Sequence, residues 1–337
     1  MAAPLAGLLA AGKDVMPYLH FPPRTVPVVH APFSWAAFVA LSLPAIAALV
    51  LGAAALARAP RAALAHGTRA RFPAWGWLGL ALIGAGWILA WKEGLVPAAW
   101  RREAFSVLWF GYILVMNAAA YRRSGHAPLI DQPARFAVLF PASVAFWWLF
   151  EYLNQFAANW YYAGVVAVND WEYFLQGSLP FSTVLPAVAS TQALLATWPR
   201  FAGATLPALR GHPSLAWIAL VAGLAALAGI GVWPEMLFPA LWLAPLAIVA
   251  GLQALACGES FFAPLARGEW RCVVEPAAAA LLCGFFWELW NSGALAKWHY
   301  SIPFVQRFHL FEMPLLGYAG YLPFGVLCAL VSAPRGR

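Results

Sequence analysis

Residues 147–154 read WWLFEYLN, and residues 284–291 read GFFWELWN. Each stretch places Glu-x-x-Asn after an aromatic run, and the two glutamates, Glu151 and Glu288, lie 137 positions apart. The same offset recurs downstream, where it pairs Phe174 with Phe311, Leu179 with Leu316, Leu185 with Leu322 and Pro186 with Pro323. Identities are few, but their register is constant. We therefore interpret the chain as an internal duplication.

Composition places this duplication in a membrane. Hydrophobic residues make up 63% of the 337-residue chain and charged residues only 10%, whereas soluble domains are roughly half apolar and a quarter charged. Nine apolar runs are long enough to cross about 30 Å of hydrocarbon. They are residues 34–57, 74–91, 105–121, 136–156, 179–198, 213–232, 236–256, 273–292 and 314–332. The sequence predicts an all-α polytopic membrane protein.

The nine predicted spans divide into one N-terminal helix and two four-helix repeats. Residues 1–73 form an N-terminal arm and the first span, residues 74–212 the first repeat, and residues 213–337 the second. Upstream of the glutamates the correspondence continues at an offset of 133, pairing Phe105 with Phe238, Trp109 with Trp242 and Gly125 with Gly258. Because each repeat holds an even number of spans, the repeats are parallel. We expect both glutamates at the same depth.

Basic residues predict the orientation, because Lys and Arg are retained on the cytoplasmic side. The loops expected on one side contain Arg58, Arg61, Arg69, Arg71, Arg122, Arg123, Arg135, Arg200, Arg210, Arg267, Arg271, Arg335 and Arg337. The N-terminus is therefore expected outside and the C-terminus in the cytoplasm, in the inner (plasma) membrane of a bacterium. The formal charge of +7 then meets anionic lipid and does not indicate nucleic acid.

Aromatic segments follow both glutamates on the expected outer side. They lie at residues 159–162 and 297–300, and the chain returns to the membrane through stretches containing Pro and Gly at 176–180 and 312–317. Interfacial or re-entrant pieces that cap a pocket would have this composition. An ordinary aromatic belt at the headgroups would have it as well.

The paired glutamates are the leading candidates for chemistry, since an ionisable residue inside a span is usually functional. If Glu151 and Glu288 share one outward cavity, burial and mutual repulsion would keep at least one protonated, as a general acid. Asn154 and Asn291, three residues on, share a helix face with them and would orient the substrate or the acid. The alternative is that each glutamate snorkels to the interface or locks adjacent helices together.

Five aromatic residues are candidate substrate contacts. Trp148, Trp287 and Trp290 flank the glutamates, and Tyr161 and Trp298 lie in the outer segments. Aromatic faces beside a proton donor would stabilise a carbocation through cation–π attraction. Packing of large side chains around the acids is the competing interpretation.

The second half alone contains His299, His309 and Glu312, residue types that bind zinc or iron. Their spacing fits no metal motif, and isolated interfacial histidines are common. They remain weak metal candidates, so no metal is predicted, and the sequence identifies no cofactor. Motifs for nucleotide hydrolysis, serine hydrolysis and zincin chemistry are missing from the sequence.

A further pattern concerns the returning segments. WYY at 160–162 is followed by LPF at 179–181, and WHY at 298–300 by LPF at 322–324. This layout resembles that of tandem-repeat membrane lycopene cyclases and related carotenoid-modifying proteins. The Pro-Glu-Glu signature of those cyclases is replaced here by PFS at 180–182, so the resemblance carries over no catalytic residue.

Together these patterns favour an integral membrane protein with an outward-facing, lipid-accessible pocket. The expected ligand is a membrane lipid or a lipophilic small molecule, modified by acid-catalysed isomerisation, cyclisation or hydration. Two alternatives stay open at this stage. One is a transporter or proton-coupled permease, and the other is a non-catalytic subunit that docks a membrane-complex partner. A homo-oligomer is also compatible with the sequence.

Overall fold

The computed structural model describes residues 2–60, 70–92, 94, 96–258 and 260–333. Arg61, Arg69, Arg335 and Arg337, which entered the predicted orientation, lie outside this part. The described part holds eight helices long and apolar enough to cross a membrane. They are α2 (Trp35–Arg58), α3 (Ala74–Trp91), α5 (Ala104–Ser124), α7 (Pro133–Ala157), α11 (Ser214–Val232), α13 (Ala240–Cys257), α14 (Arg271–Gly293) and the run Leu315–Ser332, which joins η3 (Leu315–Gly320) to α15 (Tyr321–Ser332). The chain is therefore an all-α integral membrane protein.

The predicted span 179–198 is divided between two shorter helices. These are α8 (Asp170–Phe181) and α9 (Val184–Leu195), each of 12 residues, or roughly 18 Å at 1.5 Å per residue. Ser143 of α7 stabilises the break, because its hydroxyl donates to the Phe181 carbonyl at 2.6 Å and accepts from the Leu185 N–H at 3.0 Å. Neither helix alone is as long as the hydrocarbon core is thick.

Several short elements connect the long helices. They are α1 (Ala2–Ala10), η1 (Met16–Tyr18), α4 (Ala98–Arg102), α6 (Pro128–Asp131), α10 (Pro199–Ala202), α12 (Pro234–Leu237), η2 (Ala263–Arg267), β1 (Trp160–Ala163), β2 (Lys297–Tyr300), β3 (His309–Leu310) and β4 (Met313–Pro314). The helix α1 was not predicted. It packs so closely on α11 that a Cβ at Gly7 would collide with the Ala228 carbonyl.

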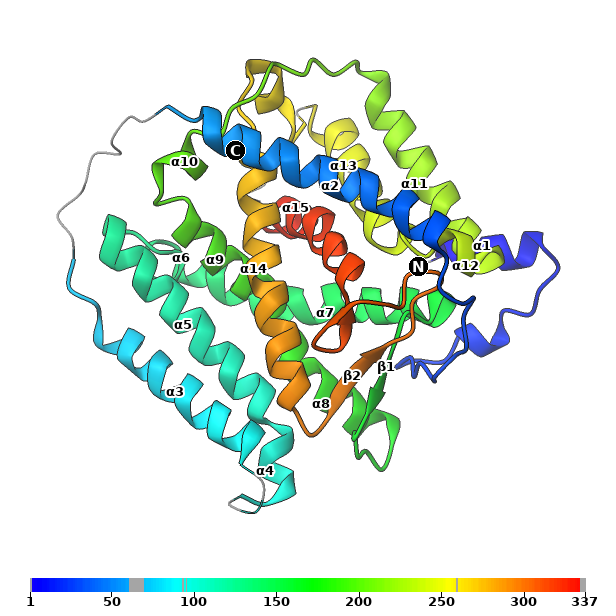
Figure 1. Cartoon of the computed structure of the whole chain (residues 1–337), viewed down its shortest axis with the longest axis horizontal. Helices are drawn as coiled ribbons and strands as arrows, with labels where there is room; N and C mark the ends of the chain where they lie inside the picture. Colours follow the sequence, from blue (N-terminus) through cyan, green and yellow to red (C-terminus); the bar gives the residue numbers. More distant parts are fainter. Residues whose placement is uncertain (1, 61–69, 93, 95, 259, 334–337) are drawn as a thin grey trace.

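Helices α3 and α5 lie side by side at one flank and α11 and α13 at the other, with α7, α14 and α15 between them (Figure 1). The largest fully buried side chains include Trp109, Tyr112, Phe150, Trp290 and Phe324. These residues come from α5, α7, α14 and α15. The core is therefore aromatic and lies where the central helices meet.

Helix ends in the two halves correspond in position. The bounds of α15 follow those of α9 by 137 residues at both ends. Helices α5 and α13 both end before a left-handed glycine, Gly125 with φ 77° and Gly258 with φ 71°, as expected where a helix must reverse without a Cβ clash. The offsets read from the sequence thus mark real helix boundaries.

A close approach of α15 to α14 gives a test of the fold. A Cβ at Gly325 would collide with the backbone carbonyl of Pro276, so Gly325→Ala should cost about 1–3 kcal/mol and lower the midpoint of thermal unfolding in detergent. Gly84→Ala in α3, where an added Cβ meets nothing within 4 Å, is the matched control and should not destabilise the protein. Equal midpoints for the two variants would contradict the packing of α15 on α14.

Candidate functional site

Two short strands close over the ends of α7 and α14. Strand β1 pairs antiparallel with β2, with Trp160 opposite Tyr300 and Tyr162 opposite Trp298. Segments whose bounds are 137 residues apart therefore lie side by side (Figure 1). Since side chains alternate along a strand, Trp160 and Tyr162 share one face of β1.

Asn154 and Asn291 anchor these strands to the helices before them. The Asn154 amide donates to the Trp160 carbonyl at 2.7 Å and accepts from the Asn159 N–H at 2.9 Å. The Asn291 amide donates to the Trp298 carbonyl at 2.8 Å and accepts from the Trp298 N–H at 2.9 Å. Both asparagines, which the sequence suggested as catalytic, satisfy the backbone of the returning chain.

Glu151 is buried near the C-terminal end of α7, with 2% of its surface exposed. Its Oε1 accepts hydrogen bonds from Trp147 at 2.9 Å, Trp160 at 3.1 Å and Tyr162 at 2.6 Å. One donor belongs to the same helix and two belong to β1. The carboxyl group therefore joins helix to strand, and it does not snorkel to the surface.

Glu288 has a matching environment in α14 and is fully buried. Its Oε1 accepts from Tyr300 at 2.7 Å and from Tyr321 at 2.8 Å. The indole of Trp298 donates to the Tyr300 hydroxyl at 2.8 Å. The other oxygen, Oε2, has no hydrogen-bond partner among the residues that the structure describes.

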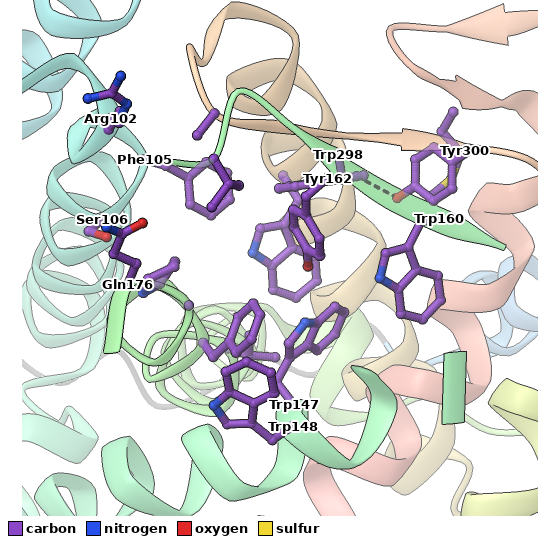
Figure 2. Close-up of a pocket in the computed structure, with 18 of the residues that line it drawn as sticks. Arg102, Phe105, Ser106, Trp147, Trp148, Trp160, Tyr162, Gln176, Trp298 and Tyr300 are labelled. Atoms are coloured by element: carbon purple, nitrogen blue, oxygen red, sulfur yellow. Dashed lines mark hydrogen bonds between the residues drawn. The ribbon is translucent and has the colours of Figure 1, made fainter. Parts of the chain in front are cut away.

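The donors to both glutamates line a single cavity of about 160 Å³. Its wall is mainly aromatic and contains Phe105, Trp147, Trp148, Trp160, Tyr162, Tyr173, Phe181, Trp242, Trp287, Trp298, Tyr300 and Tyr321. We call it the aromatic cavity. Figure 2 shows Trp160, Tyr162 and Trp298 facing it from the strands, with Trp147 and Trp148 on the opposite side. Glu151 and Glu288 stand behind this wall and reach the cavity through their tyrosine and tryptophan partners.

The strand tyrosines keep their protons at neutral pH. Burial and the neighbouring carboxyl of Glu151 raise the pKa of Tyr162 well above its ordinary value. Burial and Glu288 raise the pKa of Tyr300 in the same way. Each hydroxyl therefore remains a hydrogen-bond donor between a carboxyl group and the cavity.

Three of the five predicted aromatic contacts, Trp148, Trp287 and Trp298, line the cavity. The other two do not. Trp290 packs in the core, its ring 5.0 Å from that of Trp109, and Tyr161 lies on the other face of β1, beside His299. The residues that the sequence reasoning missed are Trp160, Tyr162, Tyr300 and Tyr321. A repeated Trp-x-Tyr after each Glu-x-x-Asn was the available signal for most of them.

The weak metal candidates are engaged in other contacts. Glu312 accepts from Lys297 at 2.7 Å and contacts His299 at 3.0 Å, and His309 lies 3.2 Å from Gln306. Partial burial favours the neutral form of Glu312, but Lys297 and His299 outweigh it and lower the pKa of its carboxyl. No group of three His, Cys, Asp or Glu residues suited to a metal occurs in the described part of the chain.

Residues 18–34, which we call the N-terminal strap, cross the strand end of the site. Arg24 donates to Asp170 at 3.0 Å and stacks on Tyr173, a cavity residue. Farther along, His30 lies 2.8 Å from Glu235. Additional contacts join Tyr18 to Phe156, Phe21 to Trp148, Thr25 to Asn154 and Val28 to Ser301. The strap therefore holds elements from both halves of the chain together.

The asparagine anchors can be tested through the strand that they hold. Asn154→Ala leaves buried backbone groups of β1 unpaired, so we expect a loss of about 1–3 kcal/mol per unsatisfied group and faster amide exchange over residues 159–163. Asn159→Ala is the control, because the side-chain oxygen of Asn159 has no partner among the described residues. Equal exchange rates over β1 in the two variants would rule out the anchoring role.

Comparison of the chain with known protein families, curated proteins and solved structures finds no match.

Proposed function

We propose that the protein is a membrane enzyme that binds a lipophilic molecule in the aromatic cavity and modifies it by proton transfer. The observation that carries this proposal is the position of the two buried carboxyl groups. Glu151 and Glu288 come from different helices, yet tyrosines bonded to both line one cavity. A structural lock between helices would not require hydroxyl groups at a cavity wall.

We further propose the topology and origin that the sequence indicates. Duplication of residues 74–212 into 213–337 would explain why, in both halves, a strand tyrosine donates to the glutamate and the asparagine three residues after the glutamate bonds to the strand backbone. Arg123, Arg135 and Arg271 lie at the ends of α5, α7 and α14 remote from the aromatic cavity. With those ends in the cytoplasm of a bacterium, the cavity faces outward and the C-terminus inward.

The geometry supports a relayed proton transfer. In its protonated form, Glu288 passes its proton to the Tyr300 or Tyr321 oxygen as that hydroxyl protonates a carbon–carbon double bond of the ligand. The electron pair of the double bond forms the new C–H bond, which leaves a carbocation and the Glu288 carboxylate. Aromatic faces such as Trp287 and Trp298 would stabilise the cation.

The fate of the cation determines the product. Loss of a proton from the neighbouring carbon, taken up by the Tyr162–Glu151 pair in its ionised form, gives an isomer. Attack by a second double bond of the ligand followed by the same loss gives a ring. Capture by water with release of a proton gives an alcohol. In each case atoms and charge balance without a cofactor.

Substitution of the acids separates proton transfer from packing. Glu288→Gln keeps a hydrogen-bond acceptor but has no acidic proton, so conversion of the co-purified lipid should fall by about 10²–10⁴-fold, as measured by mass spectrometry. Tyr300→Phe should act in the same direction. Tyr112→Phe is the matched control, because Tyr112 is a buried tyrosine bonded to Thr191 and does not line the cavity. Unchanged lipid composition in the Glu151→Gln, Glu288→Gln double variant would exclude the proposal.

A second cavity supports a proton-coupled permease as the second candidate function. It measures about 980 Å³ and lies at the other ends of α5, α7, α9, α14 and α15. Buried polar pairs lie between the cavities, including Tyr112 with Thr191 and Asn117 with Ser190. Glu275, 2% exposed, lines the second cavity. An alternating-access transporter opens one central site to each side of the membrane in turn, and two cavities on shared helices would be the two entrances to such a site.

Proton flux distinguishes the two candidates. In proteoliposomes containing a pH-sensitive dye, a permease would acidify the lumen. Glu275→Gln and Glu288→Gln, each as a single variant, would abolish this proton flux. For the enzyme, Glu275→Gln should leave lipid conversion unchanged, because Glu275 lies outside the aromatic cavity. Flux that is lost in both variants, without any lipid product, would favour the permease.

A further inference from the structure

The second cavity also has features of a ligand site, independent of the function proposed for the aromatic cavity. We call it the arginine-side cavity. Its volume of about 980 Å³ is at the upper end of the range of small-molecule sites. The wall combines arginines with apolar groups such as Phe136, Leu139 and Phe261. An amphiphilic ligand would match this combination.

The acids around this cavity have local hydrogen-bond partners. Arg271 donates to Glu275 at 2.9 Å, and the second oxygen of Glu275 accepts from Gln192 at 3.1 Å. Asp131 lies 3.4 Å from His126 and accepts from the Ala127 N–H at 3.0 Å. Arg123, Arg135 and Arg271 therefore face two acids, Asp131 and Glu275, and the wall has a formal charge of +1 when His126 is neutral.

Two arginines in the wall have no acidic partner among the described residues. Arg123 donates to the hydroxyl and carbonyl of Thr197, and Arg135 donates to the Gln132 side chain and the Ser332 carbonyl. All of these acceptors are neutral. A guanidinium has five N–H donors, so each arginine keeps donors beyond those used in the protein.

Both guanidinium groups are held in place before any ligand arrives. The guanidinium of Arg123 lies 4.3 Å from the centre of the Trp198 ring. Arg135 bonds two groups that are far apart in the chain, the side chain of Gln132 just before α7 and the Ser332 carbonyl in α15. Fixed side chains lose less entropy when they bind a ligand. The planar fork of donors matches the oxygens of a phosphate.

We propose that the arginine-side cavity binds the phosphate group of an anionic amphiphile, with Arg123 and Arg135 as its ligands. The apolar part of the wall would hold the adjoining glycerol or acyl segment. Basic pockets between helices at the cytoplasmic headgroup level are suited to such lipids. The same guanidinium groups would also accept a free phosphate, so the source of the phosphate has to be determined by experiment.

Lipid retention by the purified full-length protein tests the site. In nanodiscs of phosphatidylcholine containing a minor fraction of phosphatidylglycerol, native mass spectrometry would count the phosphatidylglycerol molecules that remain bound. Arg123→Gln with Arg135→Gln should weaken retention by about tenfold or more, the equivalent of about 1.4 kcal/mol. Arg200→Gln is the control, because Arg200 is on α10 near Thr197 but does not line the cavity.

Both arginines also bond to backbone carbonyls near the ends of α9 and α15, so their replacement could reduce lipid retention by disturbing the fold. A second variant that keeps both arginines separates this effect from the loss of the binding site. Ala333→Trp fills the cavity from its edge without changing any charge, and it should reduce retention as well. Displacement of phosphatidylglycerol by millimolar inorganic phosphate would identify a free anion as the source, and resistance to displacement would identify the lipid. Equal retention by the double arginine variant and Arg200→Gln would overturn the proposal.

Discussion

The hydrogen bond from Tyr300 to Glu288, with its counterpart from Tyr162 to Glu151, is the interaction on which the site depends. In a bilayer no water is available to solvate a carboxyl group, so each of these glutamates depends on donors within the protein, which here bond to its Oε1. The strand that follows each helix supplies one tyrosine donor. Because β1 and β2 pair with each other, satisfying the two acids also closes one wall of the aromatic cavity.

The helical framework could be predicted largely from apolar length, and its exceptions have local causes. Residues 74–91 were predicted as a span and form α3 with the same bounds. There the length of the apolar run and the polar residues on either side of it are enough to define both ends of the helix. Residues 179–198 read equally well as a span. They break because Ser143, 36 residues earlier, supplies both a donor and an acceptor at the junction. A hydropathy pattern contains no information about such a contact from another helix.

In the candidate site, the constant sequence offset relates the two glutamates but not the strands that follow them. The offset of 137 relates Glu151 to Glu288, and the hydrogen-bond donors to both glutamates line one cavity. The loop after Asn291 is one residue longer than the loop after Asn154, since the anchored carbonyls belong to Trp298 and Trp160. In the strands after this loop the offset is 138, and it is 137 again between α9 and α15. An offset of 137 would align Tyr161 with Trp298. The hydrogen bonds instead align Tyr162 with Tyr300, at an offset of 138. Because side chains alternate along a strand, this shift of one residue places the aligned side chain on the opposite face of the strand.

The two cavities differ in how their polar groups are used, and this difference sets the chemistry that each can perform. In the aromatic cavity the tyrosine hydroxyls and indole N–H groups donate to carboxyls or to one another. A ligand there gains mostly apolar and π contacts, with Arg102, Glu103 and Gln176 as further polar groups in the wall. In the arginine-side cavity three arginines face two acids, and the guanidiniums of Arg123 and Arg135 retain free donors. A ligand of the arginine-side cavity must carry negative charge. We therefore expect the two cavities to bind different molecules, an apolar one in the aromatic cavity and an anionic one in the arginine-side cavity.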